Sequence, residues 1–129
     1  MKEIVEYQIL REHFNIHCGL GKTVDNAIRN GWQLYGELQM CEDDLCQPMV
    51  KYGEKELQGD IKYYYVVTLY TRCSCLYEEF TQNFSKRVNE LIQMGYQPYG
   101  SLKMSISNRL GSRNGSPTCY LAQAMVIYR

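Results

Sequence analysis

The stretch His17–Gln33, HCGLGKTVDNAIRNGWQ, places Gly-Leu-Gly-Lys-Thr directly before a helical pattern and so raises the question of phosphate binding. A nucleotide-binding loop of the type Gly-x4-Gly-Lys-Ser/Thr wraps phosphates with successive backbone N–H groups. Counting back from Gly21, the required first glycine falls on Ile16, and no acidic strand follows to hold magnesium. The stretch is therefore predicted to be a turn before a helix capped by Thr23, where Lys22 and the first N–H groups are placed to attract an anion.

A second group suited to anion binding is the sequence NRLGSRNGSP, residues 108–117. The guanidinium groups of Arg109 and Arg113 can fork onto phosphate oxygens, and the glycines leave backbone N–H groups open to the same ligand. Ser112 and Asn114 lie in the same loop. A hairpin tip with ordinary surface arginines fits this composition equally well.

Two tyrosines, Tyr35 and Tyr99, alternate with apolar residues and are predicted on the more polar face of their strands. There they either stack on a base or pack in a subunit interface, and packing is the more common use. The predicted ligand-binding set is therefore Arg109, Arg113, Ser112, Asn114, Tyr35, Tyr99 and Lys22.

Catalytic and metal-binding patterns are sparse. The two histidines fall in one loop or strand end, no Ser/His/Asp motif is present, and the six cysteines have no paired base nearby in sequence. The spacings C-x4-C from Cys41 and C-x-C from Cys73 match no common zinc site, and the acidic run Glu42–Asp44 is typical of a solvated hairpin loop. The sequence predicts no enzyme, no metal, no cofactor and reduced thiols.

Self-comparison shows an internal repeat. Residues 24–40 align without gaps on residues 88–104 with eight identities in seventeen positions, and QPMVKY at 47–52 matches QAMVIY at 123–128 at four of six. Two matching blocks in the same order are the signature of a duplicated structural unit. The chain is predicted to be one compact domain, 1–129, made of repeat one (1–58) and repeat two (61–129), each in the order strand, helix, strand, strand.

The elements of each unit follow from hydrophobic spacing. In the second unit an apolar stripe at helical spacing predicts a helix over about 79–94 that ends at Gly95 in a left-handed cap. In the first unit a shorter stripe begins at Val24, and the helix ends at Gly31. The strand that follows is predicted to bury Leu34, Leu38 and Met40 in the first unit and Leu102, Met104 and Ile106 in the second.

The strands at 62–70 and 119–128 are apolar on both faces. Together these patterns predict an α+β fold, a tandem β-α-β-β repeat with an approximately six-stranded, mainly antiparallel sheet and two helices on one face. Helices on one side leave the other face of those strands bare, so we expect another subunit to cover it and the chain to form a homo-oligomer.

Composition narrows the function classes. The chain has 45% hydrophobic residues and a formal net charge of zero, and neither a run of eighteen apolar residues nor a signal peptide is present. The expected location is the cytoplasm, with no membrane partner. Residues 1–60 carry six basic and eleven acidic side chains, a charge of −5, whereas residues 61–129 carry eight and three, a charge of +5. The neutral total disfavours nucleic acid as a partner.

The sequences NELIQMGYQPYGSL with AQAMV, and NAIRNGWQLYGEL with QPMV, resemble a bacterial and phage domain-of-unknown-function family. Its mark is a helix that ends in Asn-Glu-Leu-Ile-x-x-Gly-Trp-Gln-Pro-x-Gly-Gly, followed by a Gln-Ala-Met-Val strand. This chain departs from the mark at Tyr96, Leu34 and the second glycine. The resemblance implies a small antiparallel sheet with a helix on it and implies no activity.

The chain also resembles, more loosely, phage anti-defence sponge proteins of the Thoeris-inhibiting kind, in size, in predicted elements and in the expected need to oligomerise. That resemblance implies sequestration of a cyclic nucleotide signal in a bacterial or phage-infected host cell. The leading hypothesis is a non-catalytic oligomeric protein that binds a small phosphorylated ligand. The alternative is a protein-interaction module that assembles through its oppositely charged halves and has no small-molecule ligand.

Overall fold

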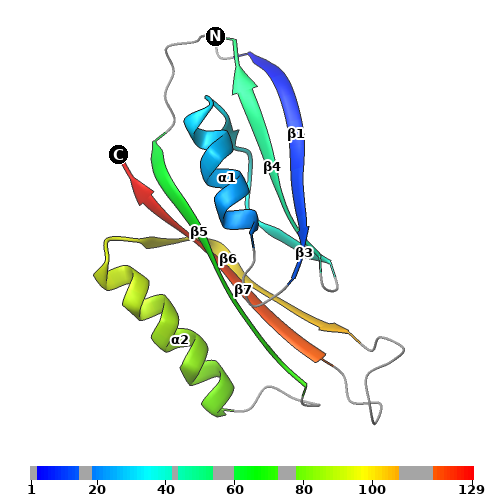
Figure 1. Ribbon diagram of the computed structural model, residues 1–129, viewed down its shortest axis with the longest axis vertical. Coiled ribbons are helices and arrows are strands. Elements are labelled where there is room, and N and C mark those ends of the chain that lie inside the picture. Colours follow the sequence, from blue (N-terminus) through cyan, green and yellow to red (C-terminus); the bar gives the residue numbers. More distant parts are fainter. Residues whose placement is uncertain (1–2, 15–18, 42–43, 54–59, 73–77, 108–117) are drawn as a thin grey trace.

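The computed structural model of the chain describes residues 3–14, 19–41, 44–53, 60–72, 78–107 and 118–129. These residues form two helices and seven strands in two consecutive groups (Figure 1). The first group is β1 (Ile4–His13), α1 (Leu20–Arg29), β2 (Gln33–Leu34), β3 (Gln39–Cys41) and β4 (Asp44–Tyr52). The second is β5 (Ile61–Thr71), α2 (Glu78–Gln93), β6 (Gln97–Ser107) and β7 (Thr118–Tyr128). The predicted α+β class is confirmed, and α2 confirms the helix expected over about 79–94.

The strands form two antiparallel sheets, so the single sheet of about six strands predicted from the sequence is wrong. Sheet A has the order β1-β4-β2, and β3 pairs with β4 further along; sheet B has the order β5-β7-β6. Helix α1 lies between the two sheets (Figure 1). The sheets stay separate because the residues of both sheets pack against this one helix.

The central core surrounds α1. Leu20 and Val24 of α1 are fully buried and belong to one cluster with Met49 of β4 and with Tyr64 and Val66 of β5. A helix that is apolar on one side only covers a single sheet, whereas a helix buried on two sides joins two. The first helix therefore holds sheet A and sheet B together.

The second helix packs on the opposite side of sheet B. Phe80 and Phe84 of α2 contact a cluster that contains Val67 of β5 and Leu121 and Met125 of β7. Successive residues of a strand point to opposite faces, so Val66 and Val67 lie on opposite sides of sheet B. The prediction that both helices cover one face is therefore wrong, and the layers run sheet A, α1, sheet B, α2.

This layering explains the strands that are apolar on both faces. In β5 and β7 one face is covered by α2, and the other is covered by α1 from the first half of the same chain. The prediction that a second subunit covers that face is wrong, because alternation along a strand reveals that both faces are buried but not which segment buries them.

The helix ends have the geometry predicted from their glycines. Gly31 and Gly95 have φ values of 91° and 102°, the left-handed conformation that closes a helix. The hydrogen bonds at the two ends correspond: Gly31 N donates to Ile28 O and Trp32 N to Ala27 O, as Gly95 N does to Ile92 O and Tyr96 N to Leu91 O. Both predicted stops are confirmed.

The start of α1 differs from the prediction. The helix begins at Leu20 with Gly19 at its N-cap and with no side-chain cap bond, so Thr23 is not the cap; its hydroxyl donates to Gly19 O at 3.2 Å. The Gly19 N–H instead donates to Glu12 Oε1 of β1 at 3.1 Å. The acceptor at the helix start thus comes from the preceding strand β1 rather than from the helix itself, and a capping pattern within the helix does not reveal it.

A second pair of glycines marks an irregularity in each sheet. Gly36 lies between β2 and β3 and Gly100 within β6, with φ values of 80° and 76°. The buried side-chain amide of Gln47 donates to Gly36 O at 3.0 Å, and that of Gln123 donates to Gly100 O at 3.2 Å. Positions that align in sequence therefore make the same hydrogen bond in the two halves.

The apolar stripe of β6 is exposed rather than buried. Leu102, Met104 and Ile106 are each at least 50% exposed, whereas Leu38, which aligns with Leu102, is 1% exposed. The cluster beneath α2 draws on β5 and β7 and on none of the described residues of β6, so this edge strand extends past the helix that was expected to cover it. The predicted burial of these three side chains is wrong.

One carboxylate joins the irregular segments of the two sheets. Glu37 Oε1 accepts the Ser101 N–H at 2.6 Å, and Glu37 Oε2 lies 3.2 Å from Lys103 Nζ. The backbone hydrogen bond from Ser101, followed by the hydrogen bond from Lys103, holds the pKa of Glu37 below its usual value. The first half of the chain is therefore anchored to the edge of β6 by a charged group.

Candidate functional site

Four members of the predicted ligand-binding set, Arg109, Ser112, Arg113 and Asn114, lie outside the described residues. The segment that contains them is bounded by Ser107 and Thr118, which pair at one end of sheet B. Tyr99 pairs with Ala124 nearer the other end. Eight residues of strand separate Tyr99 from Ser107, a length of roughly 26 Å.

The two tyrosines of the set lie on different surfaces. Tyr35 is exposed on the face of sheet A that points away from α1, where its ring meets that of Tyr7 edge-on at 6.1 Å between centroids. Tyr99 is partly buried and packs against the central core. The structure does not bring them together, so one ligand-binding set cannot contain both.

Lys22 is exposed in the first turn of α1. A helix N-terminus attracts anions because its first N–H groups lack partners within the helix. Here the carboxylate of Glu12 already accepts the Gly19 N–H, and its negative charge opposes a second anion at the same end. The Gly-Leu-Gly-Lys-Thr stretch at the start of α1 is therefore unfavourable for phosphate binding.

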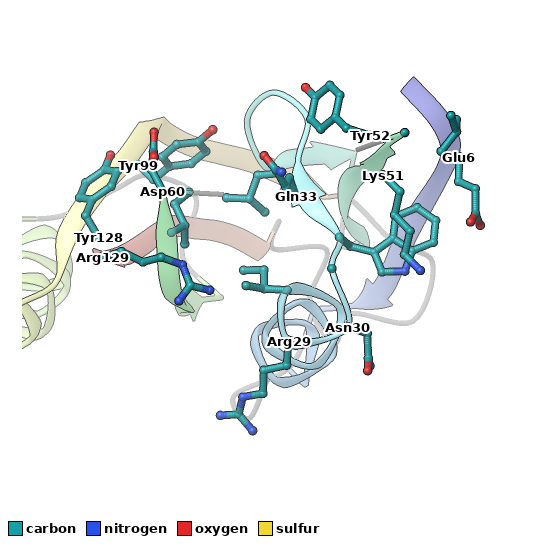
Figure 2. Close-up of a pocket in the computed structure, with 17 residues that line it drawn as sticks. Glu6, Arg29, Asn30, Gln33, Lys51, Tyr52, Asp60, Tyr99, Tyr128 and Arg129 are labelled. Atoms are coloured by element: carbon teal, nitrogen blue, oxygen red, sulfur yellow. The ribbon is translucent and has the colours of Figure 1, made fainter. Parts of the chain in front are cut away.

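A cleft of about 730 Å³ lies where the C-terminal end of α1 meets one end of each sheet (Figure 2). Its lining comes from three parts of the chain. The helix end and following turn supply residues 28–34, the end of sheet A supplies Val5, Glu6 and residues 51–53, and the end of sheet B supplies Asp60, Ile61, Tyr99, Tyr128 and Arg129. A volume of this size accommodates a small-molecule ligand.

One side of the cleft is aromatic and basic. Figure 2 shows Tyr99, Tyr128 and Arg129 together at the end of sheet B, beside Asp60. The Arg129 N–H donates to Asp60 O at 2.8 Å, which fixes the ends of β5 and β7 relative to each other. Burial raises the pKa of the Tyr99 hydroxyl above its usual value, with smaller contributions from Tyr128 and Glu37, so Tyr99 stays a hydrogen-bond donor at neutral pH.

The facing side carries a cation and a large ring. Lys51 Nζ lies 5.1 Å from the centroid of the Trp32 ring, a cation–π distance. Glu6 pairs with Lys51 across β1 and β4, and Gln33 and Tyr52 complete this side (Figure 2). The lysine is therefore held at the rim by an aromatic face.

The third wall is the end of α1. A helix C-terminus disfavours anions, because its last carbonyl groups carry partial negative charge. At this end the N–H groups of Asn30, Gly31 and Trp32 donate to carbonyls of the last turn, and the Asn30 side chain donates to Asn26 O at 3.0 Å. The carbonyls are thus occupied, and Arg29 adds a positive charge in the last turn.

The charged side chains that line the cleft are Arg29, Lys51 and Arg129 against Glu6 and Asp60, three positive groups against two negative ones. The cleft therefore combines aromatic surface with a small excess of positive charge.

Other reactive side chains of the described segments offer no comparable site. His13 Nδ1 lies 2.6 Å from Asp44 Oδ1, and Arg11 donates to Asp44 Oδ2 at 2.9 Å, on the exposed side of sheet A. Within the described residues no group of three His, Cys, Asp or Glu side chains is placed to hold a metal ion, and the cysteines there form no disulfide.

Comparisons of the chain with protein-family models, with curated proteins and with solved structures found no match. Among the residues that the structure describes, no helix is long and apolar enough to cross a membrane.

Sequence analysis found only one residue of the cleft's aromatic and basic lining, Tyr99. The sequence did not point to Arg29, Lys51, Tyr128 and Arg129, because they stand at the ends of three different elements, α1, β4 and β7, and belong to no local motif. Tyr99 was found through its alternation with apolar residues, which predicted its face of the strand but not its pairing with Ala124 of β7.

Proposed function

We propose that the chain is a non-catalytic binding protein for a small phosphorylated ligand, and that the ligand occupies the cleft at the end of α1. The observation that carries this proposal is the convergence of two tyrosines, Tyr99 and Tyr128, with three cations around a space of about 730 Å³. Aromatic rings stack on bases without regard to sequence, and guanidinium and ammonium groups bind phosphate oxygens.

The electrostatics of the cleft orient the ligand. The end of α1 opposes negative charge, so the phosphate lies toward Arg129 and Lys51 rather than over the helix. The base then faces Tyr99 and Tyr128 at the end of sheet B. A cyclic nucleotide is the candidate that the looser resemblance names, and sequestration without turnover is the corresponding role.

Two structural features belong to the same proposal. The two halves are copies of one β-α-β-β unit, supported by the corresponding helix ends at Gly31 and Gly95 and by the amide bonds of Gln47 and Gln123. The chain also forms a homo-oligomer, supported by apolar side chains that remain exposed on sheet A and on β6.

Calorimetry and thermal-shift measurements on the full chain test the binding site. The probes are cyclic mononucleotides and cyclic dinucleotides, with inorganic phosphate as a comparison. A ligand at a hundred times its Kd stabilises the folded state by about 2.7 kcal/mol, so binding raises the melting temperature visibly. Arg129→Glu and Tyr99→Ala are expected to abolish the shift.

Arg72→Glu is the matched control, because it makes the same charge change at the other end of β5. The proposal is wrong if none of the probes stabilises the protein at millimolar concentration. It is also wrong in its location if Arg72→Glu weakens binding as much as Arg129→Glu does.

A protein-interaction module remains the second candidate. The observation that favours it is the outward face of sheet A, where Tyr7, Ile9 and Tyr35 are each about half exposed. An apolar sheet face of this kind is typical of a surface that binds another protein.

A further inference from the structure

The outward face of sheet A, which we define as Tyr7, Ile9, Tyr35, Pro48 and Val50, has three apolar side chains that are about half exposed, Tyr7, Ile9 and Tyr35. Pro48 is half-buried and Val50 is buried. Tyr7 and Ile9 alternate along β1 with the half-buried Gln8 and Leu10, which face α1. Pro48 and Val50 are their partners on β4. Neither described helix covers Tyr7, Ile9 and Tyr35.

The same positions in sheet B form a face that is covered. Tyr7 pairs with Val50 as Tyr64 pairs with Val126, and Ile9 pairs with Pro48 as Val66 pairs with Ala124. Tyr35 N donates to Pro48 O, and Tyr99 pairs with Ala124. The outward face of sheet A therefore matches, residue by residue, the face of sheet B that packs on α1.

Exposure separates the two faces. Tyr64 and Val66 are 1% and 5% exposed beneath α1, whereas Tyr7 and Ile9 are 55% and 56% exposed. Apolar residues with the same spacing are thus buried against a helix in sheet B and exposed to solvent in sheet A. A face with this pattern fits a helix that docks as α1 docks on sheet B.

The docking side of α1 has identifiable chemistry. Gly21 allows close approach, since a Cβ there would lie 3.4 Å from Val66 N. Asp25 Oδ1 accepts the Tyr64 N–H of β5 at 2.7 Å. Among the described strands β5 pairs only with β7, so its other edge is open to such a bond. Ile28 adds a buried apolar side chain. The docked helix therefore combines a small residue, an acceptor and a branched apolar residue at intervals of four and three.

Helix α2 repeats this set on its outward side. The residues that align with Gly21, Asp25 and Ile28 are Ser85, Asn89 and Ile92, and all three are exposed. Helix α1 is buried on both sides, so α2 is the one described helix with a side left open. Its serine is small, and its asparagine oxygen can accept a backbone N–H as Asp25 does.

Charge does not select the partner of sheet A. Helix α2 carries Glu78, Glu79 and Glu90 against Lys86 and Arg87, a net charge of −1, so the +5 of the second half lies outside this helix. The side chains that α2 shares with the docking side of α1 are what favour it as the partner.

We propose that the outward face of sheet A binds the outward side of α2 of a second copy of this chain, in the manner in which sheet B binds α1. The contact is head-to-tail, so it produces a closed ring or an open filament. The inference rests on the assembly that the proposed function includes, and it is independent of ligand binding in the cleft.

Complementation between two variants of the full chain tests this contact. Ile9→Glu disables the face of sheet A, and Asn89→Arg disables the side of α2; both side chains are exposed, and circular dichroism checks that each variant folds. Light scattering is expected to give an oligomer for the unchanged chain and a monomer for each variant. An equimolar mixture is expected to give a heterodimer with twice the monomer mass, because each chain retains one intact surface.

Met104→Glu and Asn83→Arg are the matched controls, since they place the same new charges at exposed positions of β6 and of a different side of α2. Both are expected to leave the oligomer intact. A monomeric unchanged chain overturns the assembly together with this contact. An oligomer that Ile9→Glu dissociates and Asn89→Arg does not overturns the contact alone, in favour of a two-fold contact of sheet A.

Discussion

Gly36 and Gly100 provide a matched pair of substitutions that tests how the two halves interlock. Both have left-handed backbone conformations, with φ values of 80° and 76°. A Cβ at Gly36 meets nothing within 4 Å, whereas a Cβ at Gly100 would lie 2.7 Å from Glu37 Cγ and 2.8 Å from its Cδ. Gly36→Ala therefore strains only the backbone, and Gly100→Ala also displaces Glu37.

The two costs can be separated. A left-handed alanine costs about 1 to 2 kcal/mol, reduced by up to about 1 kcal/mol because alanine also restricts the unfolded chain. Displacing Glu37 also removes its charge-assisted bond to the Ser101 N–H. We expect Gly36→Ala to cost about 1 kcal/mol. Gly100→Ala should cost more, because it has the same backbone strain and also loses this bond.

Urea denaturation followed by circular dichroism, together with calorimetry, measures the difference. For a chain of 129 residues, 1 kcal/mol corresponds to a fall of about 4 °C in Tm, so Gly36→Ala should lower Tm by about 4 °C and Gly100→Ala by more. In a Glu37→Ala background Gly100→Ala should cost no more than Gly36→Ala does in the unchanged chain. Equal costs for the two glycines in the unchanged chain would refute the proposed contact between Glu37 and Gly100.

Three further predictions concern the polar side chains of Asp25, Gln47 and Glu37. Asp25→Ala should lower the free energy of unfolding by about 1 kcal/mol by removing the acceptor of the Tyr64 N–H, whereas Asp25→Asn, which keeps an acceptor and avoids the buried charge that raises the pKa of Asp25, should change it by less than about 0.5 kcal/mol in urea titrations. Gln47→Leu should cost about 2 to 4 kcal/mol in the same assay. The Gln47 side chain donates hydrogen bonds to Gly36 O and Pro48 O and accepts one from the Tyr64 hydroxyl at 3.1 Å, and leucine can make none of them. The folded-state pKa of Glu37 lies below 4.5, so its stabilisation is complete above pH 4.5 and is lost as the pH falls through the lowered pKa. Urea unfolding from pH 6 to pH 3 should therefore show an acid-induced loss that Glu37→Gln lacks; the raised pKa of Asp25 acts in the opposite sense in both proteins and cancels in the difference. Identical acid profiles for the two proteins would contradict the role of Glu37.

Features governed by adjacent residues were predicted well from the sequence. The stops at Gly31 and Gly95 and the extent of α2 depend on backbone conformation and on spacing along one helix, and both were confirmed. The Thr23 cap failed for an instructive reason: Glu12, eleven residues earlier, accepts the N–H at the helix start from a neighbouring strand.

Features governed by packing were predicted less well. Alternation correctly indicated that β5 and β7 are buried on both faces, but the covering element is α1 of the same chain rather than another subunit. The same alternation placed Leu102, Met104 and Ile106 in the core, although α2 does not reach them. A periodic pattern shows which residues share a face of a strand, but the packing of the helices determines which face is covered.

The cleft could not be predicted from the sequence, because its lining comes from the end of α1 and from the ends of strands in both sheets. Tyr99 lies in β6, Lys51 lies in β4, and Arg129 directly follows β7. Only the packing of both sheets on α1 brings these three residues to the same cleft. The sequence pointed instead to Arg109 and Arg113, whose segment lies outside the described residues.

The central claim, that a small phosphorylated ligand binds in the cleft, is tested most directly by following backbone amide resonances of the full chain during titration with cyclic nucleotides. Ligand binding in the cleft predicts saturable shifts at Gly31 and Gly53, which line the cleft, and none at Ser105. Shifts confined to residues 108–117, or no shifts at millimolar ligand, would contradict it.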